Sequence, residues 1–182
     1  MREPVELSKA YLLLNHGPVT LVSSAAGGKR NVMAASWAMP LDFAPPKVAV
    51  VIDKSAYSRE LIEASSEFVL NIPCRAIAGQ VLAAGSCCGR SEDKFSQSGL
   101  SVEPASIVGA PLVGGCVAWL ECKVIPEAHN EQRYDLFLAE VVRPGPIHGS
   151  FPAAAGISRT TICAPCTIWR AAVSSRPAMP SR

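Results

Sequence analysis

A polar turn before a short amphipathic segment is the part of the sequence best suited to bind an anion. The turn covers residues 53–58, and the apolar spacing of residues 59–64 predicts a helix. A helix N-terminus offers unpaired backbone N–H groups and partial positive charge. Further charge and hydrogen-bond donors come from the side chains of Lys54, Ser55, Tyr57 and Ser58. The sequence therefore predicts a site for a phosphate-bearing ligand, although such a turn can also serve only as a helix cap.

Hydrophobic strands are expected on both sides of this turn. By apolar patterning, they cover residues 19–24, 31–37, 47–52 and 67–73. Residues 38–46 are expected to form a proline-containing loop. Residues 25–30 contain Gly27-Gly28 and predict a hairpin loop, because paired glycines adopt the positive φ angles of tight turns. A phosphate-binding loop is the alternative, but these glycines lack the strand–glycine–helix context that it requires.

The second half of the chain is expected to alternate helices and long strands. Residues 76–84 predict a helix that ends at Gly85, and Asp93-Lys94-Phe95 predicts a short one. Strands are expected over residues 114–124 and 134–142. The connection between these strands contains His129, an isolated histidine of the kind that is usually only solvated.

Four motifs, taken in order, resemble the flavin reductase-like family, with its flavoredoxin branch as the most similar. They are Asn31-x-Met33-x-x-Ser36-Trp37, the pair Pro45-Pro46, Lys54-Ser55-x-Tyr57-Ser58, and the strand over residues 67–73. The resemblance covers residues 17–142. It implies a mainly β protein with a few helices, an FMN-binding split β-barrel of Greek-key topology.

The resemblance also implies which residues bind FMN. Strand 31–37 and segment 88–95 would flank the isoalloxazine, turn 54–58 would hold the phosphate, and Asn71 would bond the ribityl chain or brace the turn. The expected cofactor-binding residues are Asn31, Val32, Met33, Ala35, Ser36, Trp37, Lys54, Ser55, Tyr57, Ser58, Asn71, Cys88, Arg90 and Lys94. Trp37 is equally compatible with a core or interface position.

The segment Gly85–Phe95 matches the family pattern Ser-Gly-Arg-x-x-Asp-Lys-Phe imperfectly. Cys88 stands where the family often has a small hydroxyl residue. A solvated charged turn is the alternative interpretation, in which neither Arg90 nor Lys94 contacts a ligand.

Three functions remain open. The first is an NAD(P)H-dependent FMN oxidoreductase, either free-standing or supplying reduced flavin to a monooxygenase or another electron acceptor. The second is an FMN-binding electron carrier, and the third is a degenerate split barrel without activity. Hydride transfer depends mainly on how the nicotinamide stacks on the flavin, so no catalytic side chain is predicted. The family also implies a homodimer.

Length and composition limit the class of protein and its expected location in the cell. With 182 residues, the chain is long enough for one globular domain. Its content of 18% charged residues is typical of globular proteins. It has no apolar run of the roughly 18 residues needed to cross a bilayer and no secretory h-region, so a cytoplasmic protein is expected. The seven cysteines are expected to be reduced, and mostly small core residues. Scattered basic residues argue against nucleic-acid binding.

The segment 143–182 does not match the rest of the chain. After Glu140 there are five arginines, six prolines and no acidic residue, and the family's usual glycine-rich ending is missing. Back-translation with GC-rich codons in a shifted frame restores a similar ending. We therefore expect a domain over residues 1–142 followed by a divergent tail, and hypothesise a frameshift after Val142. Resequencing that finds one intact frame would refute it.

Cys163 and Cys166 in this tail have the spacing of a metal or redox motif. A single Cys-x-x-Cys pair, with no second pair and no histidines at ligand spacing, is weak support for zinc. No metal site is therefore predicted.

Overall fold

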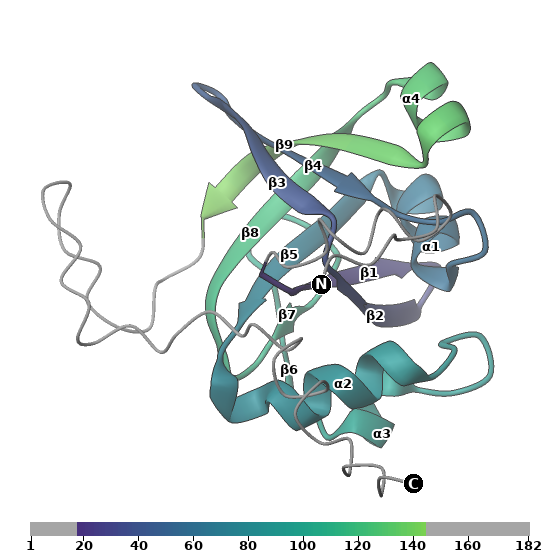
Figure 1. The fold of residues 1–182 in the computed structure, drawn as a ribbon, viewed down its shortest axis with the longest axis vertical. Helices are drawn as coiled ribbons and strands as arrows, with labels where there is room; N and C mark the ends of the chain where they lie inside the picture. Colours follow the sequence, from purple (N-terminus) through teal and green to yellow (C-terminus); the bar gives the residue numbers. More distant parts are fainter. Residues whose placement is uncertain (1–17, 145–182) are drawn as a thin grey trace, which may run out of the picture.

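The fold is given by a computed structural model, which describes residues 18–144. Seven antiparallel strands form one curved sheet in the order β2-β1-β5-β8-β9-β4-β3 (Figure 1). The strands of this sheet are β1 (Thr20–Ala26), β2 (Lys29–Ala35), β3 (Ala38–Phe43), β4 (Pro46–Val51), β5 (Glu67–Pro73), β8 (Cys116–Ile125) and β9 (Leu136–Pro144). A separate two-stranded ribbon pairs β6 (Val102–Glu103) with β7 (Leu112–Val113).

The connectivity of the sheet is a Greek key. Strands β5, β8 and β9 are successive strands of this sheet and lie side by side, with the ribbon β6–β7 inserted between β5 and β8 in the sequence. The earlier strand β4 pairs with β9. The long return from β4 to β5 passes through helix α1 (Tyr57–Ser65). In a Greek key, three strands lie side by side in order, and a long connection places the fourth strand beside the outer strand at the far end. Here β4 is that fourth strand, and it lies beside β9.

Two hydrophobic clusters lie on opposite sides of the sheet. One cluster contains Val50, Ile62, Phe68 and Phe137 and packs α1 against one face of the sheet. The other contains Val69, Val81, Phe95 and Trp119, and it packs α2 (Ala78–Ser86) and α3 (Lys94–Ser98) onto the sheet together with the small ribbon. In Figure 1, α2 and α3 lie together below the strands, and α4 (Ala128–Tyr134) lies at the opposite end.

The region expected to be a proline-containing loop is partly a strand. Residues 38–43 form β3, which pairs with β4 through a register shift between Pro40 and Asp42. Because β3 is at the edge of the sheet, the missing N–H of Pro40 costs no ladder hydrogen bond on its open side. The prediction failed because prolines mark loops in general but are tolerated on edge strands.

Three other boundaries also differ from the predictions. Strand β2 ends at Ala35, so Ser36 and Trp37 lie outside it. Residues 128–134 form helix α4, which contains His129, where a connection without regular structure was expected. A single 3-10 turn, Arg75–Ile77, precedes α2. The expected strand over residues 67–73 is confirmed as β5, and the hairpin at Gly27-Gly28 is confirmed by positive φ angles at both glycines.

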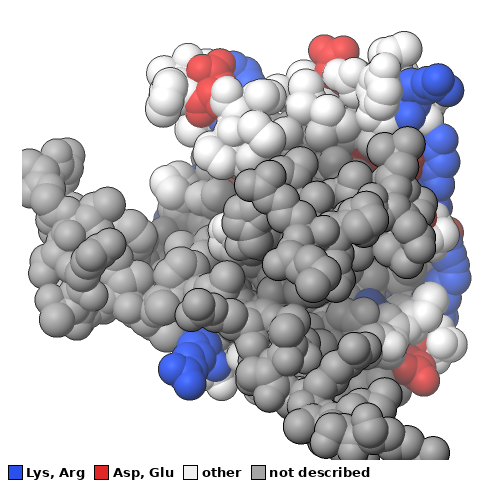
Figure 2. All heavy atoms as spheres, in the orientation of Figure 1, with Lys and Arg blue, Asp and Glu red and all other residues white. Residues whose placement is uncertain are grey.

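Within residues 18–144, no helix is both long and apolar enough to cross a lipid bilayer. The face in Figure 2 shows acidic and basic side chains interspersed with uncharged ones, with basic side chains most frequent along the edge near α1 and α4.

Candidate functional site

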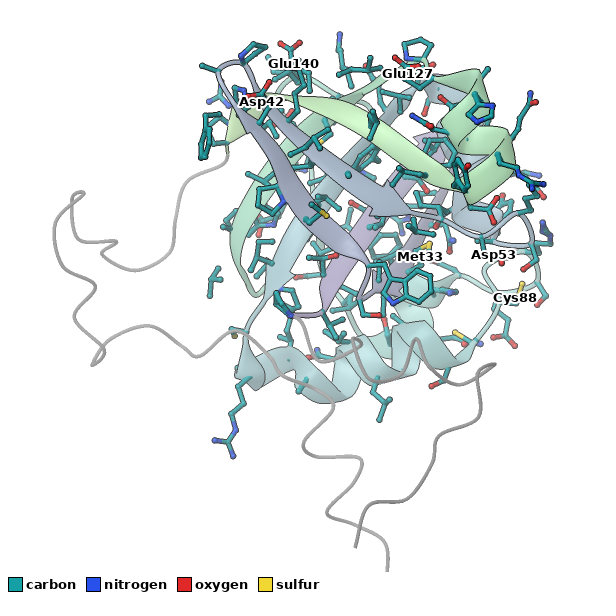
Figure 3. The ribbon with its side chains drawn as sticks, turned by 45° about the horizontal axis from the view of Figure 1, so that its top comes forward. Met33, Asp42, Asp53, Cys88, Glu127 and Glu140 are labelled. Atoms are coloured by element: carbon teal, nitrogen blue, oxygen red, sulfur yellow. The ribbon has the colours of Figure 1, made fainter. Side chains whose placement is uncertain are left out.

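A pocket lies where strand β2, the start of α1 and the connection between α2 and α3 meet. Its volume is about 230 Å³. It is lined by Asn31, Met33, Ala34, Ser55, Ala56, Tyr57, Ser58, Gly85, Cys87, Cys88, Gly89 and Lys94. In Figure 3, Met33, Asp53 and Cys88 lie near one another on this side of the molecule, far from Asp42 and Glu140.

Asn31 supplies the most unusual polar group of this pocket. The side chain is only 3% exposed, and Nδ2 donates a hydrogen bond to Ser58 Oγ at 2.9 Å. Among the described residues, Asn31 Oδ1 has no hydrogen-bond partner. The two amide ends can be interchanged, but either placement leaves one polar atom unsatisfied at the pocket wall. Buried polar atoms nearly always have a partner, so this one indicates a place for a ligand or water.

Two neighbours of Asn31 reinforce this arrangement. Ser24 lies directly opposite Asn31 in the β1–β2 register, and its buried hydroxyl also has no partner among the described residues. Gly89 passes so close that a Cβ atom there would be 2.0 Å from Asn31 Oδ1. The backbone of the α2–α3 connection can approach Asn31 only because residue 89 has no side chain.

The start of α1 forms the second wall. Its N-cap residue is Ala56, and no side chain caps the helix within the described part of the chain. The Ser55 backbone N–H and hydroxyl both donate to Asp53 Oδ1, at 2.8 and 2.6 Å. The hydrogen bonds from Ser55 lower the pKa of Asp53 below its ordinary value. The Ser55 hydroxyl therefore braces the turn, and the backbone N–H groups of Tyr57 and Ser58 are the donors left for an anion.

Lys94 contributes a buried positive charge. It is 7% exposed and lines the pocket, and its ammonium donates to the Ala84 carbonyl at 2.9 Å. Burial lowers the pKa of Lys94, and the nearby thiols of Cys87 and Cys88 act in the opposite direction. The ammonium has donors beyond the one used by Ala84, so it is suited to bind an anionic group.

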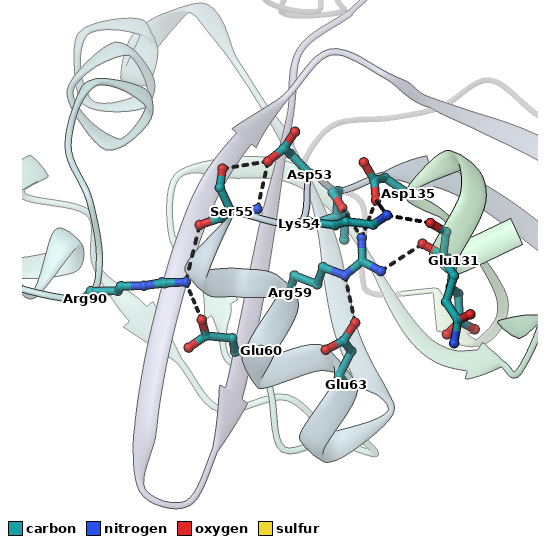
Figure 4. Close-up of polar contacts among 11 residues, drawn as sticks. Asp53, Lys54, Ser55, Arg59, Glu60, Glu63, Arg90, Glu131 and Asp135 are labelled. Carbon is teal, nitrogen blue, oxygen red and sulfur yellow. Dashed lines mark hydrogen bonds and ion pairs between the residues drawn. The ribbon is translucent and has the colours of Figure 1, made fainter. Parts of the chain in front are cut away.

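Arg90 connects the two walls from outside the pocket. Its guanidinium pairs with Glu60 and donates to the Ser55 carbonyl at 3.3 Å (Figure 4). The guanidinium also lies 5.7 Å from the centre of the Tyr57 ring. These contacts fasten the α2–α3 connection to the start of α1. Arg90 therefore positions both walls in this structure.

Arg59 holds the other side of α1. It is buried and bonds the Glu63 carboxylate at 2.7 Å and the Asp135 carboxylate at 2.6 Å. The same guanidinium donates to the carbonyls of Ile52 and Glu131. As Figure 4 shows, this network joins α1 to α4 and to Asp135, the residue between α4 and β9. Through the Ile52 carbonyl it also holds the residue before the turn. The turn is thereby held rigidly, as a preformed binding site requires.

Comparison with known proteins identifies the chain. Residues 13–152 match the family model described as flavin reductase like domain. The chain belongs to this family. YddH of Escherichia coli is 45% identical over 142 residues, which cover 76% of this chain and 75% of YddH.

Two solved structures of the flavin reductase like family resemble this one. An FMN-binding domain of a flavin reductases-like enzyme from Shewanella baltica is 47% identical, with a TM-score of 0.68, covering 77% of this chain and 74% of that one. Flavoredoxin of Desulfovibrio vulgaris is 29% identical, with a TM-score of 0.69, covering 81% and 78%. The split β-barrel predicted from the sequence is confirmed.

The expected cofactor-binding residues lie in the pocket, beside it, in the core or on the surface. Half of them line the pocket, namely Asn31, Met33, Ser55, Tyr57, Ser58, Cys88 and Lys94. Ser36 lines an adjoining hollow of about 200 Å³, which shares Ala34 and Gly85 with the pocket. Val32 and Ala35 are buried core residues, and Trp37 is exposed just beyond β2, which excludes a core position for its ring.

Two of the expected residues are directed elsewhere. Lys54, expected to hold a phosphate, donates to the Gln132 carbonyl at 2.5 Å and does not line the pocket. Its charge also faces Asp135 at 4.0 Å, so the acidic end of α4 attracts it away from the site. Asn71 is fully buried in the core, where Nδ2 donates to Leu21 O, Val69 O and Ser23 Oγ. Its Oδ1 accepts from Val113 N at 2.8 Å, so its role here is to brace the sheet.

Several residues of the pocket were not selected from the sequence. They are Ala34, Ala56, Gly85, Cys87 and Gly89. Gly89 carried a usable signal, because an isolated glycine often marks a close backbone approach. The two alanines carried none, since a small apolar residue is common everywhere.

The structure describes five of the seven cysteines. Cys74, Cys116 and Cys122 are buried free thiols, as expected, whereas Cys87 is half-buried and Cys88 exposed. In the described part of the chain, no group of three His, Cys, Asp or Glu side chains is arranged as metal ligands. Cys163 and Cys166 lie outside the described residues, as does the proposed frameshift.

Proposed function

We propose that this chain is an FMN-binding oxidoreductase that accepts hydride from NAD(P)H and passes the electrons to a separate acceptor, such as a monooxygenase. The observation that carries the proposal is the unpartnered Asn31 Oδ1 in a pocket beside an uncapped helix start. A buried amide of this kind suits a polar ligand, and a helix start suits a phosphate.

The residues present fit FMN. The backbone N–H groups of Tyr57 and Ser58 and the ammonium of Lys94 would hold the phosphate, because they combine aligned donors with positive charge. Asn31 would bond the polar part of the ligand. Bound FMN would supply the hydride and electron chemistry, while the protein supplies binding and orientation.

A ligand of this size requires both hollows. Each is smaller than the roughly 300 Å³ at which ligand pockets usually begin. They share Ala34 and Gly85, so together they form one groove between β2 and α2. The groove is narrow at Gly85, where an added Cβ would lie 3.3 Å from the Cβ of Ala34. A large side chain at position 85 would therefore close the groove.

The experiment uses this constriction. We expect Gly85→Leu to weaken FMN binding about tenfold or more, measured by flavin absorbance and fluorescence titration. Gly79→Leu on the same helix is the matched control, because an added Cβ at Gly79 meets no atom within 4 Å. Its FMN affinity should stay within about twofold of wild type. Equal affinity of the two variants would contradict binding in this groove.

Addition of NADH or NADPH to the FMN-loaded protein separates the two flavin functions. Rapid bleaching of the flavin absorbance, and continued turnover with an acceptor, are expected of the oxidoreductase. The likeness to Desulfovibrio flavoredoxin favours an electron carrier as the second candidate. That candidate predicts bound FMN that is bleached by a chemical reductant but not efficiently by either nicotinamide. A protein that takes up no FMN would contradict both.

We also propose that the chain forms a homodimer through strand β3. Exposed apolar side chains occur at every second position along this edge, at Trp37, Met39, Leu41 and Phe43. Such a row exceeds the scattered apolar residues of an ordinary surface, and Phe43 is 98% exposed. Sedimentation velocity should show that Phe43→Asp shifts the protein toward monomer. The control Ile107→Asp, at an exposed apolar residue away from β3, should not.

A further inference from the structure

Two consecutive thiols line the wall of the pocket. Cys87 and Cys88 follow α2 directly, and the structure exposes Cys88 while leaving Cys87 half-buried. The Cys87 thiol donates to the Ala83 carbonyl at a sulfur–oxygen distance of 3.5 Å. Cys88 is therefore the more accessible nucleophile of the pair, and it is located on a surface that a ligand would occupy.

The other described thiols are protected. Cys74, Cys116 and Cys122 are buried, and burial raises the pKa values of Cys116 and Cys122 to about 12. Because the thiolate is the reactive form, these two thiols are inert at neutral pH. Cys88 has the opposite surroundings, because it is exposed to solvent and lines the pocket. A thiol must be accessible to solvent before it can attack a disulfide.

The same wall contains the unpartnered amide of Asn31. Gly89, the residue after Cys88, contacts Asn31 Oδ1 so closely that it tolerates no Cβ. A group attached to Cys88 and a ligand bonded to Asn31 would therefore occupy the same space.

We propose that Cys88 is a site of reversible modification by small disulfides of the glutathione disulfide class, and that the attached group blocks the pocket. The Cys88 thiolate attacks one sulfur of the disulfide, a new sulfur–sulfur bond forms, the original one breaks, and the second half leaves as a thiolate that takes up a proton. No other reactant is required. The blocking of FMN, but not the modification itself, rests on the proposed function.

The experiment incubates the full-length protein with oxidised glutathione and locates the adduct by mass spectrometry. Arg75 and Arg90 delimit a tryptic peptide that contains both thiols, covering residues 76–90. We expect this peptide to gain one glutathione in wild type and in Cys87→Ser, and none in Cys88→Ser. Dithiothreitol should remove the adduct. Circular dichroism establishes that both variants are folded.

Saturating FMN tests the position of the adduct. It should slow modification of Cys88 about tenfold or more, and the isolated adduct should bind FMN about tenfold more weakly until it is reduced. Equal labelling of Cys87→Ser and Cys88→Ser, or labelling of Cys116 and Cys122 at the same rate, would overturn the assignment of Cys88. Unchanged labelling in a protein that binds FMN would overturn the blocking. If the unmodified protein binds no FMN, the proposed function fails, while the peptide data still decide whether Cys88 is the modified residue.

Discussion

Two buried asparagines on the same sheet differ in how their amides are satisfied. Asn71 on β5 is fully enclosed, with three acceptors around Nδ2 and the Val113 N–H on Oδ1. Asn31 on β2 has one hydrogen bond, to Ser58, and an oxygen without a partner among the described residues. Both were expected to contact a cofactor, and the structure separates them.

The difference indicates what each region is for. The Asn71 amide joins β1, β5 and the ribbon strand β7, so its hydrogen bonds are part of the stability of the fold. The Asn31 amide lacks a partner at the wall of a pocket, and leaving a buried polar atom unsatisfied costs about 1–3 kcal/mol. A protein that keeps such a group gains something from it other than stability, and binding is the simplest gain.

The largest change in stability is expected from substitution of Asn71, whose amide is fully hydrogen-bonded. Asn71→Ala removes the acceptor of the buried Val113 N–H and leaves a gap beside Ser23, so we expect a loss of about 3 kcal/mol in the free energy of unfolding. Urea denaturation of the protein without FMN measures this loss. In the folded fraction, FMN affinity should change little. A stable Asn71→Ala protein that has lost FMN binding would reverse the roles of the two residues.

The core and pocket thiols give a second contrast, in pH dependence. Burial raises the pKa values of Cys116 and Cys122 from 9.0 to about 12 in the folded protein. Above the unfolded pKa the unfolded chain releases these protons and the folded chain keeps them, so stability falls as pH rises from about 9 toward 12. At about pH 10, the expected loss is about 1 kcal/mol per thiol.

Denaturation at several pH values measures this slope. The double variant Cys116→Ala/Cys122→Ala should start from a lower stability, because it loses packing, but decline less steeply above about pH 9. Cys88→Ser is the control, because it alters an exposed thiol and keeps both buried thiols. Parallel slopes for the double variant and wild type would mean that the core thiols ionise in the folded protein.

The smallest change in stability is expected from substitution of Asn31, whose amide oxygen has no partner among the described residues. Asn31→Ala removes the hydrogen bond to Ser58 but also an unsatisfied oxygen, so stability without FMN should change by less than about 1 kcal/mol. FMN binding should weaken about tenfold, equivalent to about 1.4 kcal/mol. Fluorescence titration and urea denaturation of the same preparation give both values. A large loss of stability with unchanged affinity would show that Asn31 is only structural.

Local patterns predicted the parts of the fold that depend on neighbours in sequence. Gly27-Gly28 specified a hairpin because both residues adopt positive φ. Residues 67–73 formed the expected strand, since a run of apolar residues between turn signals suits a buried strand. The sequence did not predict edge strand β3, because a segment with prolines and exposed side chains lacks the pattern of a strand. Its pairing with β4 is visible only in the tertiary structure.

The candidate site was predictable only where a residue's type limits its role. The hydroxyls of Ser55, Tyr57 and Ser58 indicated one wall of the pocket. The family resemblance added Asn31, Met33, Cys88 and Lys94. In this structure Lys54 bonds the Gln132 carbonyl and faces Asp135, because a flexible charged side chain follows the nearest opposite charge. Its contact with a phosphate stays a prediction.

From the sequence alone, the resemblance of four ordered motifs indicated the family and its Greek-key barrel. Hydrophobic periodicity and turn residues act over short distances, so they predicted the individual strands and helices that surround the pocket. Only the tertiary structure decided that Asn31 faces a pocket and Asn71 a core. The two residues are of the same type on similar strands, and their difference lies in partners distant in sequence. Gly89 and Ser58 meet Asn31, whereas Val113 and Ser23 meet Asn71. Hydrogen-bond satisfaction is a property of three-dimensional packing, so no local pattern encodes it.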